Sequence, residues 1–441
     1  MTELHRPNLA HDFHSAPIDA DLRASIEGQA LGIHRVADDD RTGTDRWLDA
    51  VSRGFLDPER GEKDYEAFFE RAVYRRKLGV TDATGPDAAV PVATFGSWGA
   101  DLTVPGGTTV PACAISSVTV APTHRRRGLL RSIMAGELRT AAGLGFPLAV
   151  LTVSESSIYG RFGFAPAAHA AHWKIDTRRA RWIGPEPEGR IDFVTREQGR
   201  ELAPALHDRI RVTSPGEIDM PGGHWDRFFG TRPDAEKAGE RRVAQYTSAT
   251  GEVEGLVIYA VGHNHDDFTL STVDVHLLLA ATDAAYAALW RFVLSMDLIG
   301  TVTAGQLSLD EPLWWMIADQ RAATITSRDH QYVRILDVPT ALSARSYDVT
   351  DTVAFEVSDP FGIAEGVFVL SAGDEPGVDV VDEAPVGVPL VRLGVAELSA
   401  LLLGGVSAVT LAKAGRLEAD DPARIARVFG STITPRLSFW Y

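Results

Sequence analysis

The segment Ser117–Ser132, SVTVAPTHRRRGLLRS, constrains the fold of this chain more than any other. Its apolar first part alternates as a strand does, and from Gly128 onward apolar residues recur at helical spacing. A strand that ends in a loop and opens a helix brings unpaired backbone N–H groups and the positive end of the helix dipole to one point. Arg125, Arg126 and Arg127 stand directly before that helix. The segment therefore predicts a site for a pyrophosphate-like anion, to which Gly128 gives close access.

Other anion-binding motifs fit this segment less well. It contains neither the Walker loop, Gly-x-x-x-x-Gly-Lys-Ser/Thr, nor the Rossmann fingerprint, Gly-x-Gly-x-x-Gly. The chain has 60 acidic and 43 basic residues and a net charge of −17, which argues against nucleic acid as a partner and favours cationic substrates. A solvated basic helix start remains the alternative for the arginines. The strand before them and the apolar run Pro147–Ser154 after the helix favour the anion site.

The order of predicted elements indicates several domains, because 441 residues are too many for one core. The first part reads as two helices, several antiparallel strands, a helix and a buried strand. The helices are predicted at Arg46–Phe55, at Tyr65–Leu78 with a C-terminus at Gly79, and at Gly128–Ala142. Strand, strand, helix and strand then recur at Val253–Val261, Phe268–Ala280, Ala284–Met296 and Gly300–Leu307.

The second occurrence of this order lacks the anion site. Where the first has arginines and Gly128, the second has Ala281–Ala284, ATDA, with no basic residue and no glycine. Beyond about Tyr332, short strands with turn signals and the helix candidates Val395–Leu403 and Asp421–Phe429 indicate a third domain. We therefore predict an α+β protein with domains at 1–178, 179–330 and 331–441.

Composition excludes several other classes of protein. No run approaches the roughly 18–20 apolar residues of a membrane span, and the polar segment Met1–Ala20 does not resemble a signal peptide. Cys113 is the only cysteine, which excludes an internal disulfide and fits a reducing compartment, so we expect a cytoplasmic protein. The histidines and aspartates of His263–Asp267 stand between two strands without a further cluster, so we expect a polar loop there and no metal site.

The residues around the arginines resemble a known family. Val118-Thr119-Val120-x-Pro122-x-x-Arg125-Arg126-x-Gly128-x-Leu130 is similar to motif A of the GCN5-related N-acetyltransferases (GNAT), with Leu130 where Gly or Ala is usual. Together with SESSIYGRFGFAPA, which begins at Ser154, the segment resembles the enhanced intracellular survival (Eis) acetyltransferases. That resemblance extends over the whole chain. It implies two tandem GNAT-type domains, the second degenerate, followed by a sterol-carrier-protein-like domain, and a homohexamer.

The resemblance also implies the reaction and the residues that perform it. The enzyme would transfer an acetyl group from acetyl-CoA directly to an amine, with Tyr159 as general acid and the terminal carboxylate of Tyr441 as base. Asp57 would face the acceptor, and so would Trp440, at a penultimate position that is acidic in some relatives that acetylate aminoglycosides. Acetyl-CoA would be bound by Val118, Thr119, Val120, Arg125, Arg126, Arg127, Gly128, Leu129, Leu130, Arg131, Ser154 and Glu155.

The sequence leaves the acceptor open. Aminoglycoside-like amines, polyamines and protein lysines all suit an acidic enzyme. A function from another class, a non-catalytic protein that binds acyl-CoA or lipid through its third domain, is the alternative.

Overall fold

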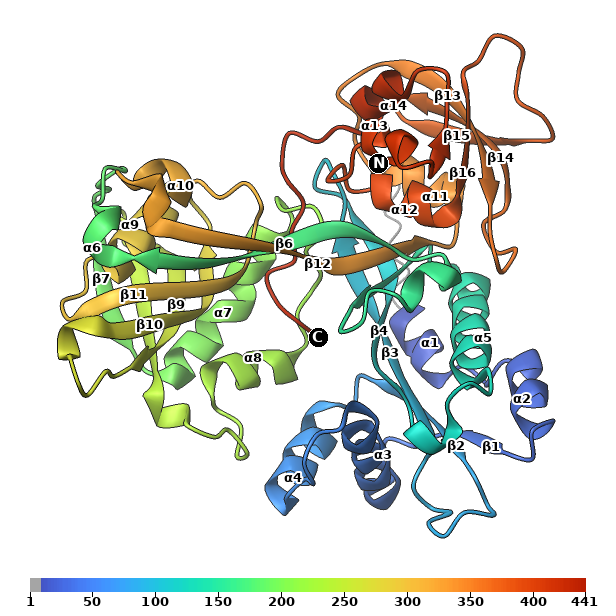
Figure 1. Cartoon of the computed structure of the whole chain (residues 1–441), viewed down its shortest axis with the longest axis horizontal. Helices are drawn as coiled ribbons and strands as arrows, with labels where there is room; N and C mark the ends of the chain where they lie inside the picture. The colour runs from blue at the N-terminus through green and yellow to red at the C-terminus, as the bar shows by residue number, and fades with distance from the viewer. Residues whose placement is uncertain (1–8) are drawn as a thin grey trace. The chain divides into compact units, whose positions relative to one another are not determined.

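The computed structural model describes residues 9–441, which form two compact units (Figure 1). The first unit contains the chain up to Ala167, Gln331–Thr432 and Tyr441. The second contains Ala168–His330 and Ile433–Trp440. We describe each unit separately.

The first unit is built around a sheet with the strand order β1-β2-β3-β4-β5-β12. Neighbouring strands are antiparallel, except that β4 and β5 are parallel and are joined by the helix α5. Gln331–Ile335 of β12 pair with β5. The strands are β1 (Gly32–Arg35), β2 (Arg76–Thr81), β3 (Ala93–Thr103), β4 (Thr109–Val120), β5 (Leu148–Thr152) and β12 (Ala323–Ile335).

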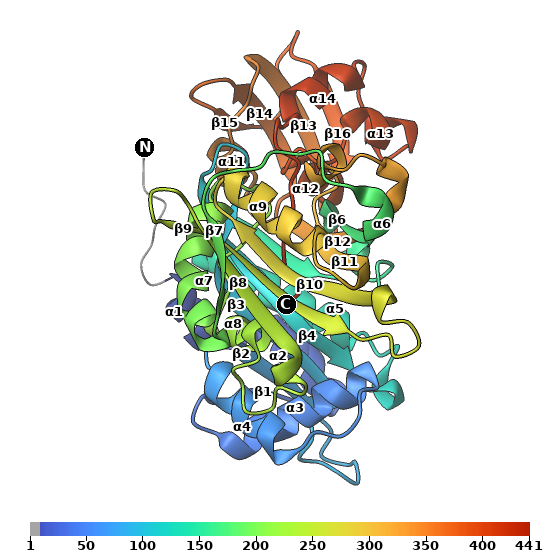
Figure 2. The ribbon, with the colours of Figure 1, turned by 90° about the vertical axis from the view of Figure 1, so that its left-hand side faces the viewer.

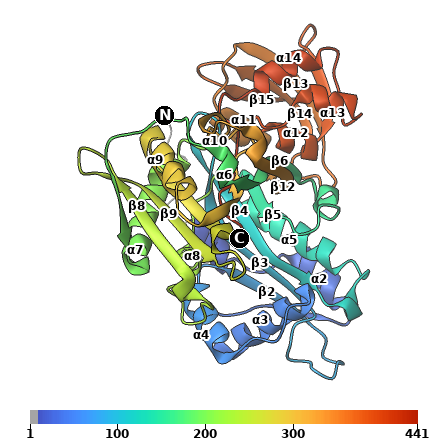
Figure 3. The same cartoon turned by 60° about the vertical axis from the view of Figure 1, so that its left-hand side comes forward.

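Helices cover both faces of this sheet. The core on one face contains Phe95, Cys113 and Leu151 of the sheet and buried residues of α1 (Leu9–Ser15), α2 (Ala20–Glu27) and α5 (Leu129–Leu144). Figure 3 shows α2 beside α5. Trp47 of α3 (Arg41–Phe55) belongs to a separate core that also includes α4 (Glu62–Arg71).

Two predicted helices have different outcomes. The helix predicted at Arg46–Phe55 is confirmed as α3, which begins five residues earlier because the Asp40 side chain accepts a hydrogen bond from the N–H of Gly43. The helix predicted to run to Leu78 and end at Gly79 is wrong in its second half, because α4 ends at Arg71 and Arg76–Thr81 form β2. Pairing of β2 with β1 and β3 overrides the local helical pattern.

The third domain belongs to the first unit and has α+β architecture, as predicted (Figure 2). Its sheet has the order β15-β14-β13-β16-β17. The strands are β13 (Asp351–Ser358), β14 (Gly366–Ala372), β15 (Gly377–Val381), β16 (Leu390–Gly394) and β17 (Leu417–Glu418). The helices are α11 (Val338–Ala344), α12 (Val395–Leu401), α13 (Ala408–Lys413) and α14 (Pro422–Phe429).

The second unit repeats the arrangement of the first. Its strand order is β6-β11-β10-β9-β8-β7, and α9 joins the parallel strands β10 and β11 as α5 joins β4 and β5. The strands are β6 (Ala165–Asp176), β7 (Arg190–Val194), β8 (Arg241–Thr247), β9 (Val253–Gly262), β10 (Ser271–Ala280) and β11 (Ile299–Leu307). The helices are α6 (Thr177–Ala180), α7 (Arg196–Arg211), α8 (Gly222–Phe229), α9 (Asp283–Leu294) and α10 (Leu313–Met316). The repeat predicted from element order is therefore present.

A buried ion pair ties the N-terminal segment to the first sheet. The Arg76 guanidinium donates to the Glu137 carboxylate of α5 at 3.0 Å, and both side chains are fully buried. Arg76 also donates to the carbonyl of Pro17 at 3.3 Å, and Ser97 donates to Glu137 at 3.1 Å. Each charge depends on the other, since a lone buried charge is strongly unfavourable.

We expect Arg76→Met to lower the free energy of unfolding by about 3–5 kcal/mol, because it leaves Glu137 buried without a cation. Urea denaturation measures this change. In the matched double variant Arg76→Met/Glu137→Leu, which removes both charges, most of the stability should return. A single variant as stable as the parent would contradict this account.

Candidate active site

The site begins where β4 separates from β5. The parallel pairing joins Ala112–Ile115 to Leu148–Leu151, whereas β4 continues to Val120 with no β5 partner among the described residues. A register irregularity against β3 lies in the same stretch, and Ser117 there has a φ of +54°. The backbone beyond Ile115 is therefore left unpaired on its β5 side and is available to a ligand.

The loop after β4, residues 121–128, leads into a helix without a side-chain cap. We call this segment the anion loop. Gly128 is the N-cap residue of α5, with a φ of +77°, and within residues 9–441 no side chain caps this helix end. A Cβ at Gly128 would have no described heavy atom within 4 Å, so the backbone faces open space. Arg126 also adopts a positive φ, +64°. Free N–H groups in a first turn with guanidinium groups nearby are the features expected of an anion site.

The equivalent helix of the second unit is capped. The hydroxyl of Thr282 accepts a hydrogen bond from the N–H of Ala285 at 3.2 Å, and the acidic Asp283 lies in the first turn of α9. A hydroxyl cap and a carboxylate satisfy the positive helix end from within the chain. The second half therefore lacks the uncapped helix start that the first half has.

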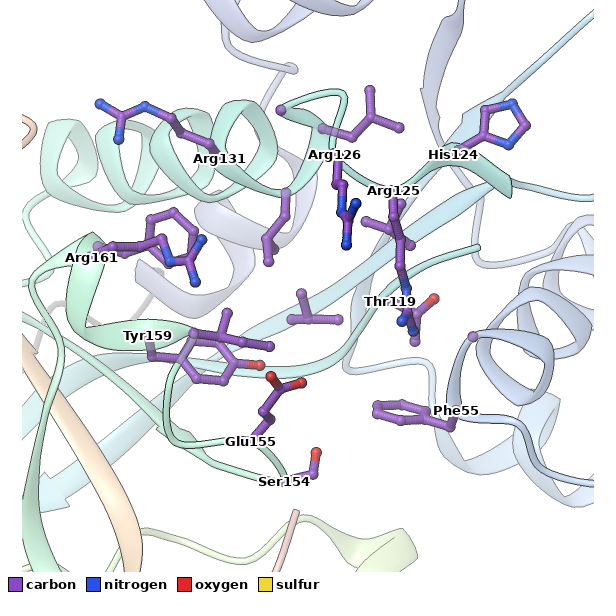
Figure 4. A pocket seen from close by; sticks show the side chains of 18 of the residues that line it. Phe55, Thr119, His124, Arg125, Arg126, Arg131, Ser154, Glu155, Tyr159 and Arg161 are labelled. Atoms are coloured by element: carbon purple, nitrogen blue, oxygen red, sulfur yellow. The ribbon is translucent and has the colours of Figure 1, made fainter. Parts of the chain in front are cut away.

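A cavity of about 970 Å³ extends from the loop along the gap between the strands (Figure 4). A cavity of this volume accommodates a ligand of cofactor size. Of the predicted cofactor residues, all but Arg127 line it. The lining consists of Gly54, Phe55, Leu56, Val118, Thr119, Val120, His124, Arg125, Arg126, Gly128, Leu129, Leu130, Arg131, Ser154, Glu155, Ile158, Tyr159, Arg161 and Phe162.

Tyr159 lies in the short 3-10 helix Tyr159–Phe162, with its ring buried. Figure 4 shows its hydroxyl directed into the cavity, with Glu155 beside it. Burial, and then the negative charge of Glu155, raise the pKa of Tyr159 to about 12. The phenol therefore keeps its proton at neutral pH and is able to donate it inside the cavity.

The end of the chain is held at the end of β5. The hydroxyl of Thr152 donates a hydrogen bond to the main-chain oxygen of Tyr441 at 2.9 Å. The Tyr441 ring is buried, edge-on to Trp98 with 5.3 Å between centroids, and burial raises the pKa of its phenol. Thr152 ends β5, two residues before Ser154 of the cavity lining. Thr152 thus holds the Tyr441 main-chain oxygen at a strand end that leads, two residues further on, into the cavity lining.

Three other predicted residues lie apart from the cavity lining. Arg127 donates to the carbonyl of Gln29 at 3.3 Å. Asp57 forms an ion pair with Arg60 at 3.7 Å, while Phe55 and Leu56 just before it reach the cavity. Trp440 belongs to the second unit, is 39% exposed, and accepts a hydrogen bond on its carbonyl from Arg227 at 2.7 Å.

Sequence reasoning missed several lining residues. His124 and Arg161 stand inside the two segments that carry the family resemblance, so their position was the available signal. The His124 ring contacts the Asp82 carboxylate at 3.1 Å. Hydrogen bonds from Thr84, and then from His124, lower the pKa of Asp82 to about 2. An ionised Asp82 therefore orients His124 at the rim of the anion loop. Thr152 gave no signal, because its partner Tyr441 is 289 residues away.

Across residues 9–441, no three His, Cys, Asp or Glu side chains gather as a metal-binding group. No helix in that range is both long and apolar enough to cross a membrane.

Comparisons with known proteins support the domain reading. Acetyltransferase (GNAT) domain models match residues 35–167 and 216–335, and a sterol carrier protein domain model matches residues 338–438. These matches confirm the predicted order of two GNAT-type domains and a sterol-carrier-type domain.

Individual relatives cover nearly the whole chain. An uncharacterized N-acetyltransferase of Streptomyces avermitilis is 40% identical over 412 residues, 91% of this chain and 93% of the relative. The N-acetyltransferase Eis of Mycobacterium tuberculosis is 34% identical over 375 residues, 82% of this chain and 88% of the relative. The crystal structure of Eis1 from Mycobacterium abscessus matches with a TM-score of 0.78 and 26% identity, covering 93% of this chain and 100% of that one.

We expect Gly128→Asp to weaken coenzyme A binding at least about 100-fold, because a carboxylate about 4 Å from a phosphate costs about 4 kcal/mol at an effective dielectric constant of about 20. Titration calorimetry measures the affinity. Gly128→Asn is the matched control, because Asn has the same shape, tolerates positive φ and carries no charge, and it should lose less than about tenfold. Equal losses in both variants would show that space, not charge, decides binding here.

Proposed function

Because the chain belongs to the Eis-type N-acetyltransferases of the GCN5-related superfamily, we propose that it transfers the acetyl group of acetyl-CoA to the primary amine of a cationic acceptor. Acceptors of this kind are aminoglycoside-like amines, polyamines and protein lysines. The transfer is direct, within a ternary complex. The observation that carries the proposal is one cavity that joins the uncapped, arginine-flanked start of α5 to the protonated phenol of Tyr159.

In the proposed complex the anion loop binds the phosphates of acetyl-CoA. The N–H groups at the start of α5 and the guanidinium groups of Arg125, Arg126 and Arg131 supply charge-assisted hydrogen bonds. The unpaired backbone of Val118–Val120 takes the peptide-like pantetheine arm as a strand would. Ser154 and Glu155 line the cavity at the end of β5.

The chemistry requires one proton acceptor and one proton donor. The neutral amine nitrogen attacks the thioester carbonyl, the carbon–sulfur bond breaks, and coenzyme A leaves as a thiolate. Tyr159 protonates that sulfur. A free alkylamine has a pKa near 10, so a base must take its proton, and we assign this role to the terminal carboxylate of Tyr441, positioned by Thr152.

A thiol-release assay with acetyl-CoA and a panel of amines tests the function. Release that depends on an amine supports the proposal and identifies the acceptor class. Tight binding of acetyl-CoA without turnover on any amine would contradict it and favour a binding protein. By analogy with the family we also propose a cytoplasmic homohexamer, for which sedimentation velocity is the test of assembly.

We expect Tyr159→Phe to lower kcat by about 10²-fold or more, because it removes one proton donor and little volume. The KM for acetyl-CoA should change little. Since the pKa of Tyr159 is raised to about 12, its proton is present below that pH and lost only as the pH rises through it. The variant should therefore lower the pH–rate profile by the same factor from pH 6 to 10. Near-normal turnover would assign the proton to water or to another group.

Appending one glycine after Tyr441 should remove most activity. The added residue displaces the carboxylate by roughly 3.3–3.6 Å and leaves a neutral amide at Tyr441. Coenzyme A affinity and the circular dichroism spectrum should stay unchanged. Tyr441→Phe, which keeps the terminal carboxylate and an apolar ring, is the matched control and should stay active. Full activity of the extended chain, verified intact by mass spectrometry, would exclude this base.

A further inference from the structure

The loop Asp359–Ala364, which joins β13 to β14 in the third domain, packs against the acetyltransferase domain. We call this segment the 359–364 loop. The Asp359 carboxylate accepts hydrogen bonds from the N–H groups of Phe361 at 3.0 Å, Ile363 at 3.0 Å and Ala364 at 2.8 Å. A carboxylate that accepts a hydrogen bond from the backbone N–H two residues further on closes an Asx-turn. These hydrogen bonds fix the shape of the loop, and Phe361 packs from it against the core of the first sheet.

A buried ion pair fixes the base of the 359–364 loop. The guanidinium of Arg334, on β12, donates to both carboxylate oxygens of Asp359 at 2.9 Å, and both side chains are fully buried. Burial alone would raise the pKa of Asp359, but Arg334 and the backbone donors bring it below its usual value. Because β12 pairs with β5 of the first sheet, this ion pair joins the loop to the sheet that carries the cavity.

Phe361 contacts two residues of the cavity lining. Its ring is stacked on that of Phe162, with 6.1 Å between centroids and 16° between planes. The guanidinium carbon of Arg131 lies 5.1 Å from its centroid. Arg131 comes from the first turn of α5 and Phe162 from the 3-10 helix that carries Tyr159. Phe361 is absent from the lining itself, so it acts through these two neighbours.

The turn that carries Tyr159 lies close to the same ion pair. Gly163, which ends this turn with a φ of +83°, has no room for a Cβ, because that atom would overlap Nη1 of Arg334 and lie 2.8 Å from Val395. Within residues 9–441, Nη1 and Nε of Arg334 have no hydrogen-bond partner. The close packing of Gly163 on the Arg334 guanidinium leaves the turn no room to move toward the ion pair.

We infer that Phe361 is a positioning residue of the acetyl-CoA site. Its ring contacts Arg131 and Phe162 of the cavity lining and the Arg334 guanidinium of the buried ion pair, so the third domain sets the affinity of the first domain for the cofactor without contacting it. The inference rests on the proposed function, since it takes the ligand of the cavity to be coenzyme A. A cation over an aromatic face is a directional attraction, so it depends on the ring and not only on its volume.

The test is a double-mutant cycle between Phe361 and Arg131, read as the calorimetric Kd of coenzyme A and as kcat and KM for acetyl-CoA. Phe361→Leu keeps an apolar side chain and removes the aromatic face. We expect it to raise Kd and KM about fivefold and to leave kcat within about twofold, because a cation–π contact contributes about 1 kcal/mol. In an Arg131→Gln background the same change should have a smaller effect, because only the contacts with Phe162 and Arg334 are then left to lose. Phe361→Tyr, which restores the ring, should restore the affinity.

Phe355→Leu is the matched control. Phe355 is fully buried in the same domain, edge-on to Phe429, so this change tests whether general loosening of the third domain weakens binding. We expect it to leave the Kd of coenzyme A unchanged. An equal loss in Phe355→Leu, an unchanged Kd in Phe361→Leu, or an equal loss with and without Arg131 would overturn the inference. A parent enzyme that does not bind coenzyme A would overturn the proposed function, and this inference with it.

Discussion

The separation of β4 from β5 beyond Ile115 is the constraint on which the rest of the site depends. Backbone groups that a sheet would satisfy are left for a ligand, and the loop that follows brings an uncapped helix to the same place. The second unit tests this interpretation internally. It has the same parallel pair joined by a helix, but Thr282 and Asp283 satisfy the start of α9 from within the chain. The two halves thus share a fold, and they differ in whether the N–H groups at the start of the connecting helix, α5 or α9, have a side-chain cap.

Features encoded locally could be predicted from the sequence. The strand, loop and helix around Gly128 and the strand–helix–strand order near Ala284 follow from apolar spacing over a few residues, and the structure contains both. The stretch from Arg76 could not be predicted this way. Its residues have helical spacing, but Arg76 pairs with Glu137, 61 positions further along, and the segment becomes a strand. Tertiary pairing decides such cases.

The candidate site shows the same limit. The three consecutive arginines cannot be told apart in the sequence. In the structure, Arg126 has a positive φ, Arg127 donates to the carbonyl of Gln29, and Arg125 and Arg126 line the cavity. No spacing rule distinguishes them. The roles of Thr152 and Phe361 could not be predicted from the sequence either, because their partners lie far away in the chain. A motif therefore predicts which segment forms a site, and long-range packing decides which of its side chains take part.

The third domain contributes contacts that position parts of the candidate site. Buried ion pairs are often no more stable than apolar packing, so Arg334–Asp359 is weak evidence for stability and better understood as a means of fixing geometry. It holds the 359–364 loop against Phe162, whose turn carries the phenol that the proposed mechanism uses as an acid. That mechanism places an anion site on α5 and a proton donor on a separate element, the Tyr159 turn. The Phe361 ring contacts both elements and keeps the distance between them constant. The strands β4 and β5 separate beyond Ile115 and would not fix that distance alone.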